Sequence, residues 1–338
     1  MMKKSKLPPG INSLVSNTFF HGGAFLLALD GGIMNRFTCC FIKNFSDEIM
    51  LKAIHDYKPV FYMSGPFHIQ ALSNMRAGDY DLSSLVCVMP SGGMVTPACV
   101  HRLQSLLPSL KMIYQFYGSS EVGGVSWTHD VRDACLGSLS PGVTAYIRNM
   151  ETGARMREGE VGEIMVKTGT TMKGYLNNSK ATGELYDEEG FVHMGDLGYY
   201  DKTGKLFFKD RIKEVIKCQN KWFGPSEVEE MIETIQGVAE ACVWVMTMMF
   251  QNLFSHFCFI QSTYDVMKCD DIVHVGVVLR RDVTDNIDKK VISDHVRNNL
   301  PAHKHITGDI FLLDSIPHNP TGKKLRRVLK SQQKDGKL

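Results

Sequence analysis

The stretch from Thr96 to Glu121, TPACVHRLQSLLPSLKMIYQFYGSSE, decides the fold class of this 338-residue chain. Its Thr-Pro start is typical of the first turn of a helix. The residues predicted to face inward from that helix are Val100, Leu103 and Leu107. Lys111–Phe116 then reads as a strand that runs into the loop Tyr117–Glu121. Because ligands dock beyond the carboxyl ends of strands in open α/β sheets, this loop is a candidate binding site.

The residues before this stretch repeat the same alternation of helix and strand. Ser46 is a predicted helix cap, and the helix ends before Pro59. The stripe predicted to face inward comprises Ile49, Met50, Ala53, Ile54 and Tyr57. A buried strand is expected at Val60–Met63. Alternating helices and strands of this kind predict an α/β fold in which helices cover a sheet.

The pattern of predicted helices and strands changes twice further along the chain. From about residue 140, short alternating segments between glycine turns predict a small β subdomain. After Arg211 the pattern predicts a small α+β unit, with an amphipathic helix around Val228 and strands at Val238–Val245, Val273–Leu279 and Ile310–Leu313. We therefore expect a layered α/β domain at 1–210, with its β-rich part at about 140–210, followed by a C-terminal domain at 211–338.

Composition limits the classes of partner and compartment. Lys and Arg number 38 against 36 Asp and Glu, and a net charge of +2 supplies no field for nucleic acid. Nine cysteines without C-x-x-C spacing favour scattered reduced thiols. The basic start is interrupted by Pro8, Pro9 and Gly10, which predicts no signal peptide. Met246–Ile260 falls short of the roughly 20 apolar residues that span a bilayer, so we expect no transmembrane segment.

Four motifs concentrate the residues suited to chemistry. A hydroxyl and a carboxylate in Tyr117–Glu121 suit a phosphate and its Mg²⁺, and the acidic side chain of Gly195-Asp196 suits the hydroxyls of a ribose. Each alone is also an ordinary turn. The charged run Asp210–Lys217 precedes a Pro-led helix, and the alternative interpretation of this run is a solvated strand. The segment Ile316–Arg327 presents a lysine on a Pro- and Gly-rich loop, where a cation can neutralise a reacting carboxylate or phosphate.

In this order and spacing, the motifs resemble the superfamily of AMP-forming acyl-CoA synthetases, 4-coumarate-CoA ligases and beetle-type luciferases. The resemblance covers almost the whole chain from about Phe19. It implies that a carboxylic acid reacts with ATP to give an acyl-adenylate and pyrophosphate. The C-terminal domain then rotates, and CoA displaces AMP; in luciferases the adenylate is oxidised instead. ATP, AMP, Mg²⁺ and CoA are the cofactors implied, and the resemblance leaves the acid and the oligomeric state open.

The resemblance also implies a role for individual residues. For the nucleotide, Tyr117 and Gly118 would border the adenine, Ser120 would contact the α-phosphate, and Asp196 and Arg211 would bind the ribose. Glu121 would hold Mg²⁺, and Gly92 and Gly93 would line the adenine and the acid pocket, with His21 at the pocket edge. Lys323 would serve adenylation, Lys217 would serve the second half-reaction, and Lys213 would be the hinge.

Two departures from the family pattern leave a second function open. The Ser/Thr/Gly-rich loop that wraps the β- and γ-phosphates in the family does not occur before His21. In addition, residues 246–270, rich in Met, Phe and Cys, interrupt the expected join between two strands. The sequence therefore predicts an acid-thiol ligase, and the alternatives are a catalytically inactive, truncated relative and a luciferase-like monooxygenase. The terminal Gly336-Lys337-Leu338 approaches a peroxisomal address, which gives peroxisome or cytoplasm as the expected location.

Overall fold

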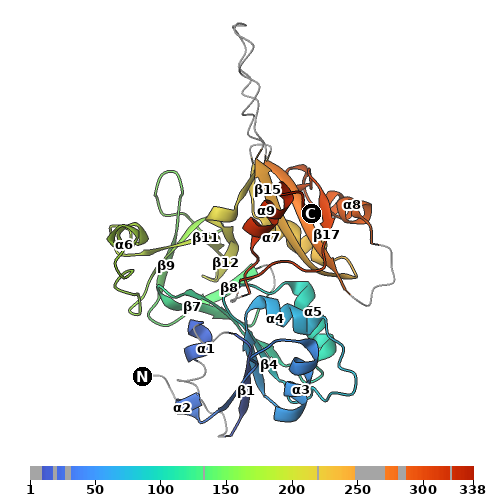
Figure 1. The fold of residues 1–338 in the computed structure, drawn as a ribbon. Helices are drawn as coiled ribbons and strands as arrows, with labels where there is room; N and C mark the ends of the chain where they lie inside the picture. The colour runs from blue at the N-terminus through green and yellow to red at the C-terminus, as the bar shows by residue number, and fades with distance from the viewer. Residues whose placement is uncertain are drawn as a thin grey trace, which may run out of the picture. The chain divides into compact units, whose positions relative to one another are not determined.

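The protein divides into two units, which are described separately below (Figure 1). The computed structural model describes residues 10–17, 21–26, 32–131, 134–218, 221–247, 271–280, 287–319 and 322–338, without the side chains of Leu26, Met34, Asn35, Lys217, Lys221, Trp222 and Thr247. The first unit is Met1–Ile212 with His318–Lys323. The second is Lys213–Pro317 with Lys324–Leu338. No helix in these ranges is both long and apolar enough to cross a membrane.

The first unit contains a five-stranded parallel sheet in the order β2-β1-β3-β4-β5. Its strands are β1 (Asn12–Val15), β2 (Thr38–Phe41), β3 (Phe61–Ser64), β4 (Cys87–Pro90) and β5 (Met112–Ile113). Parallel neighbours require crossover connections, and helices supply them. The helices of this region are α1 (Gly22–Leu26), α2 (Gly32–Asn35), α3 (Asp47–Tyr57), α4 (Pro66–Ser73) and α5 (Pro97–Leu106). The predicted α/β class is confirmed.

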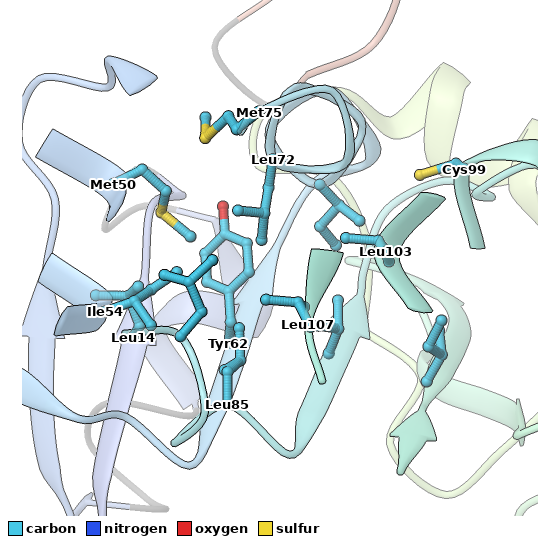
Figure 2. Close-up of a cluster of buried hydrophobic side chains, with 14 of the residues drawn as sticks. Leu14, Met50, Ile54, Tyr62, Leu72, Met75, Leu85, Cys99, Leu103 and Leu107 are labelled. Carbon is cyan, nitrogen blue, oxygen red and sulfur yellow. The ribbon is translucent and has the colours of Figure 1, made fainter. Parts of the chain in front are cut away.

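One hydrophobic cluster joins the crossover helices to this sheet (Figure 2). The predicted caps form: the Ile49 amide donates to Ser46 Oγ at the start of α3, and the Cys99 amide donates to Thr96 Oγ1 at the start of α5. The predicted inward stripe of α3 is partly wrong. Ile49 and Tyr57 are 45% and 56% exposed, whereas Leu51 is buried. The buried arc of α3 is centred nearer Leu51 than Ile49, and Tyr57 is the last residue of the helix.

The predicted strand Lys111–Phe116 is in fact divided between two sheets. β5 ends at Ile113 as the last parallel strand, and β6 (Gln115–Ser119) begins an antiparallel sheet. Tyr114 lies at the break, where its ring stacks on that of Trp127 with 5.2 Å between centroids. The predicted loop beginning at Tyr117 is corrected accordingly. Tyr117 is still in β6, and the turn starts at Ser120.

The seven-stranded antiparallel sheet has the order β6-β7-β8-β12-β11-β10-β9. After β6 its strands are β7 (Gly123–Thr128), β8 (Cys135–Leu139), β9 (Thr144–Arg148), β10 (Gly162–Lys167), β11 (Val192–Tyr200) and β12 (Leu206–Arg211), and α6 (Ser179–Leu185) lies between β10 and β11. Its buried cluster includes Val125, Ile147, Ile164 and Val192. The β-rich region therefore begins at β6, earlier than the change in texture at about residue 140.

The second unit is α+β. Its strands are β13 (Ile216–Cys218), β14 (Lys221–Phe223), β15 (Val238–Thr247), β16 (Asp271–Leu279) and β17 (Ile310–Leu312). Its helices are α7 (Pro225–Glu233), α8 (Lys289–Asn299) and α9 (Arg326–Lys334), with 3₁₀ turns at η3 (Ile212–Glu214), which spans the boundary between the units, and η4 (Ala302–Lys304). Val228 and Ile232 of α7 and Val275 of β16 are fully buried in the main cluster. Leu338 packs against a second cluster around Trp244.

The pairing of β15 with β16 shows that the first two residues of the interruption predicted at 246–270 belong to a strand. Met246 pairs with Ile272 and Thr247 with Asp271, so both residues belong to β15. The rest of the interruption, 248–270, lies outside the described residues. Opposed residues at the end of an antiparallel ladder are close enough for a two-residue turn to join them.

Replacing residues 248–270 by Asn-Gly is expected to leave the free energy of unfolding within about 1 kcal/mol of the parent value, since the turn closes the existing register. Urea unfolding followed by circular dichroism measures this. In the control variant, Asn-Gly replaces residues 248–270 and Asp271 is deleted as well. This control shifts the pairing by one residue, turns the buried valines of β16 outward and should unfold the hairpin. Equal loss of stability in both variants would contradict the prediction.

Candidate active site

A buried carboxylate, Asp196, lies at the centre of three residues singled out in the sequence. Asp196 on β11 pairs directly with Arg211 on β12, and Arg211 Nε lies 2.8 Å from Asp196 Oδ1. The Tyr117 hydroxyl donates to Asp196 Oδ2 at 2.8 Å. Asp196 is only 2% exposed. Two side chains from different strands thus hold the buried Asp196 carboxylate in place.

The electrostatics of Tyr117 follow from this carboxylate. Burial raises the pKa of the Tyr117 hydroxyl well above its usual value, and the neighbouring Asp196 charge raises it further. Tyr117 therefore stays protonated and acts as a hydrogen-bond donor at all physiological pH values. A donor of fixed protonation state holds Asp196 in one orientation.

Glu121 lies in the turn between β6 and β7. Burial opposes its ionisation, but hydrogen bonds from Ser119 and from the Tyr175 hydroxyl outweigh burial and lower the pKa of Glu121. Tyr175 donates to Glu121 Oε1 at 2.9 Å. Ser120, beside Glu121, is exposed at the start of the turn. The predicted phosphate and metal residues thus share one turn, with an ionised carboxylate available.

The donor set at this turn fits Mg²⁺. Mg²⁺ commonly binds through one or two carboxylates together with substrate phosphates and water, rather than inside an all-protein cage. Across the described ranges, no three His, Cys, Asp or Glu side chains gather into such a cage. Glu121 supplies one carboxylate of the kind that the ion uses.

Two glycines directly after β4 have close neighbours: Gly92 lies against His21, and Gly93 lies against Pro66. Gly92 has φ +81°, and a Cβ there would lie 3.2 Å from His21 Nε2; a Cβ at Gly93 would lie 2.9 Å from Pro66 Cγ. Ser91 forms an isolated parallel bridge with Phe116. Gly92 and Tyr117 therefore follow neighbouring paired residues, which brings the glycines to the same side of the unit as the Asp196 site.

Lys323 lies on the loop His318–Lys323, which belongs to the first unit. The loop closes through hydrogen bonds in both directions, from the Lys323 amide to Asn319 Oδ1 and from the Asn319 amide to the Lys323 carbonyl, each 2.9 Å. Burial lowers the pKa of His21, and the Lys323 ammonium lowers it further. Lys323 thus lies near enough to act on His21 electrostatically, and His21 is neutral at physiological pH.

The sequence did not single out Asn17, which supports this region. Asn17 follows β1 and is 4% exposed. Its Oδ1 accepts from the Gly65 amide at 2.8 Å and from Ser64 Oγ at 3.1 Å, and its Nδ2 lies 3.5 Å from His21 Nδ1. An asparagine after a strand gives little sequence signal, because the groups that bind its oxygen here, Ser64 and Gly65, lie more than forty positions away.

Lys213 and Lys217 belong to the second unit. Lys213 is exposed in η3, and the division between the units falls between Ile212 and Lys213. Lys217 is in β13 opposite Trp222, and its side chain lies outside the described residues. The hinge and second-step roles of these lysines stay predictions.

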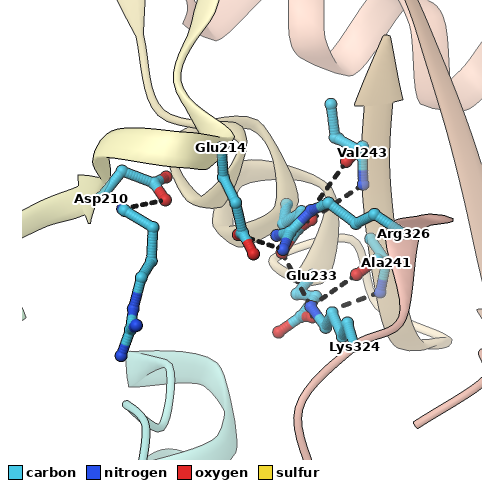
Figure 3. Close-up of polar contacts among 9 residues, drawn as sticks. Asp210, Glu214, Glu233, Ala241, Val243, Lys324 and Arg326 are labelled. Atoms are coloured by element: carbon cyan, nitrogen blue, oxygen red, sulfur yellow. Dashed lines mark hydrogen bonds and ion pairs between the residues drawn. The ribbon is translucent and has the colours of Figure 1, made fainter. Parts of the chain in front are cut away.

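Within the second unit, charged side chains form a cluster around the buried carboxylates Glu229 and Glu233, which the sequence did not predict (Figure 3). Arg326 contacts Glu214 at 2.5 Å and Glu229 at 2.7 Å. Lys324 contacts Glu229 at 2.8 Å and Glu233 at 3.6 Å, and it donates to the Ala241 carbonyl at 2.6 Å. Burial opposes ionisation of Glu229, but Arg326 and Lys324 lower its pKa to about 2.

Comparison with known sequences gives a consistent set of relatives. Residues 5–176 match the family described as AMP-binding enzyme. The chain is 29% identical over 322 residues to a probable 4-coumarate-CoA ligase 3 of Dictyostelium discoideum, covering 92% of this chain and 54% of that protein. It is 31% identical over 296 residues to acyl-CoA synthetase 7 of Caenorhabditis elegans, covering 87% and 51%. The chain thus spans about half the length of the curated relatives it matches.

Solved structures share the fold. ATP-bound MatB from Rhodopseudomonas palustris superposes with a TM-score of 0.79 at 20% identity, covering 98% of this chain and 61% of that one. At this identity the similarity establishes the fold. It agrees with the parallel sheet, the antiparallel sheet and the α+β unit described above.

Proposed function

This chain belongs to the AMP-binding enzyme family, and from that premise we propose that it serves as an acid-thiol ligase, which adenylates a carboxylic acid with ATP and then transfers the acyl group to CoA. The observation that carries the proposal is the Asp196 carboxylate, 2% exposed, with Tyr117 and Arg211 on either oxygen. Such a fixed carboxylate suits the two hydroxyls of a ribose. Gly92, Gly93 and Gly118 would border the adenine without side chains in its way.

The first half-reaction requires charge to be neutralised where the acid meets the α-phosphate. An oxygen of the substrate carboxylate forms a bond to the α-phosphorus, and the bond to pyrophosphate breaks. Lys323 would stabilise the charge on these oxygens, and Ser120 would donate to the α-phosphate. His21, neutral beside Lys323, would border the acid without adding charge. Glu121 would hold Mg²⁺, which when bound offsets the charge of the phosphates.

For the second half-reaction, the CoA sulfur would attack the acyl carbon and AMP would leave. We propose Lys217 as the cation that serves this step and Lys213 as the hinge between a domain at 1–210 and another at 211–338. There is a physical reason to assign a different lysine to each half-reaction. Each step needs a cation at the reacting oxygens, and a mobile domain can exchange one lysine for another.

The two lysines give a test of the proposal. Lys323→Ala is expected to lower pyrophosphate exchange into ATP by roughly 100-fold, the scale of one lost charge-stabilising donor. Lys217→Ala is expected to leave exchange within about twofold and to slow formation of the acyl-CoA thioester. Exchange with a panel of carboxylic acids, and thioester formation from presynthesised acyl-adenylate, measure the two steps. Indistinguishable defects in the two variants would count against the assignment.

A second candidate function is nucleotide binding without adenylation. The Asp196 carboxylate with Tyr117 and Arg211 would bind a ribose without acting on the phosphates, which supports this alternative. Calorimetric titration of AMP separates the two. A chain that binds AMP but gives no exchange with any acid is a binding protein. One that exchanges pyrophosphate is an enzyme. Peroxisome or cytoplasm remains the predicted location.

A further inference from the structure

The turn that carries Glu121 is held by a segment distant in sequence, Thr168–Tyr175, which we call the 168–175 clamp. The Thr170 hydroxyl donates to the Val122 carbonyl at 2.7 Å, and the Thr168 hydroxyl lies 3.1 Å from the same oxygen. The Met172 amide donates to the Glu121 carbonyl at 2.7 Å. Two consecutive carbonyls of the turn therefore accept hydrogen bonds from one segment.

The clamp also reaches the Glu121 side chain. The Tyr175 hydroxyl donates to Glu121 Oε1 at 2.9 Å. A hydrogen bond to a carboxylate is stronger than one between neutral groups and restricts the orientation of the acceptor. The backbone carbonyl and the carboxylate of Glu121 are thus both held by the same segment.

The clamp is itself supported by the residues that follow it. The Tyr175 amide donates to Thr182 Oγ1 of α6 at 2.9 Å, and the Tyr186 hydroxyl donates to the Met172 carbonyl. Gly174 has φ +153°, and a Cβ there would lie 2.7 Å from Thr182 Cγ2, so the chain passes closely over α6. Support from a helix makes Tyr175 a fixed donor although the residue is 40% exposed.

We propose that Tyr175 is a positioning residue for divalent-cation binding: with the rest of the 168–175 clamp, it orients the Glu121 carboxylate toward a cation that also contacts the phosphate of the nucleotide. This inference rests on the proposed function, because it takes Glu121 as the cation ligand. One carboxylate supplies few of the ligands of such an ion, so its affinity depends on how well that carboxylate is placed.

Mn²⁺ affinity in the presence of AMP tests the proposal, with free Mn²⁺ measured by electron paramagnetic resonance. Tyr175→Phe is expected to weaken Mn²⁺ binding roughly tenfold, the scale of one hydrogen bond to a charged group. Thr170→Val should weaken it by a smaller factor. The matched control is Tyr146→Phe, which removes the 2.7 Å hydrogen bond from Tyr146 on β9 to another carboxylate, Asp187, between α6 and β11. It should leave Mn²⁺ affinity unchanged.

Two further measurements separate positioning from loss of structure. AMP affinity in EDTA and the unfolding temperature should be the same in Tyr175→Phe and Tyr146→Phe. Equal Mn²⁺ affinity in these two variants would overturn the inference and leave the nucleotide proposal standing, as would a wild-type chain that binds AMP but no Mn²⁺. A wild-type chain that binds neither would overturn both.

Discussion

Replacing Arg326 by methionine is expected to lower the free energy of unfolding of the second unit by about 3 kcal/mol, because it leaves a buried carboxylate with one cation instead of two. Glu229 is 5% exposed and lies 2.7 Å from Arg326 and 2.8 Å from Lys324. Methionine keeps most of the side-chain volume, so the loss reports charge rather than packing. Lys324 remains as a partner, which places the effect at the low end for a broken buried pair.

Hydrogen exchange localises this effect. Peptides from α7 and β15 should exchange faster in Arg326→Met, while peptides from β3 and β4 in the first unit should not change. Arg327→Met is the matched control, since Arg327 is the next residue and is exposed. Equal protection of α7 in the two variants would show that the cluster does not stabilise the unit.

The same cluster makes the free energy of unfolding of the second unit depend on pH. In the folded chain the pKa of Glu229 is about 2, below its usual 4.5, so its contribution to stability is present above pH 4.5 and is lost as pH falls toward 2. Arg326→Met removes part of the interaction that lowers this pKa. The stability difference between wild type and variant should therefore shrink over that acid range.

Local signals in the sequence account for most of the fold that was predicted. Ser46, Thr96 and Asp288 each cap a helix through a side-chain oxygen, and these caps need only residues within one turn. The break at Tyr114 was missed for the opposite reason. A continuous apolar run looks the same whether it stays in one sheet or passes to another, and the choice depends on distant partners such as Trp127.

At the site, too, the sequence revealed the residues that belong to local motifs and missed those that depend on distant partners. Asp196 and Arg211 stood out as parts of motifs, but their direct pairing depends on the register of β11 against β12. Tyr175 is more than fifty residues from Glu121 and carries no motif of its own. Glu229 and Glu233 of α7 are charged residues on the inward face of an amphipathic helix, where periodicity predicts apolar side chains. Their partners, Lys324 and Arg326, come from the far end of the chain.

Replacing Gly118 by alanine is expected to weaken AMP binding at least tenfold, because the new methyl group has no room beside the next strand. A Cβ at Gly118 would lie 2.1 Å from the Gly123 carbonyl oxygen, a separation that only movement of the backbone can relieve. Overpacking of this kind costs about 1–3 kcal/mol, and the strands that would move carry Tyr117 and the Glu121 turn. Calorimetric titration with AMP measures the loss.

Gly124→Ala is the control, and its position makes the comparison strict. Gly124 pairs with Gly118 across the same two strands, yet a Cβ at Gly124 meets nothing within 4 Å. Both substitutions add one methyl group and the same loss of backbone freedom to the same hairpin. If Gly124→Ala weakens AMP binding as much as Gly118→Ala, the requirement for glycine at position 118 comes from backbone freedom and not from the close approach of the Gly123 carbonyl. If neither does, the β6–β7 hairpin does not border the nucleotide.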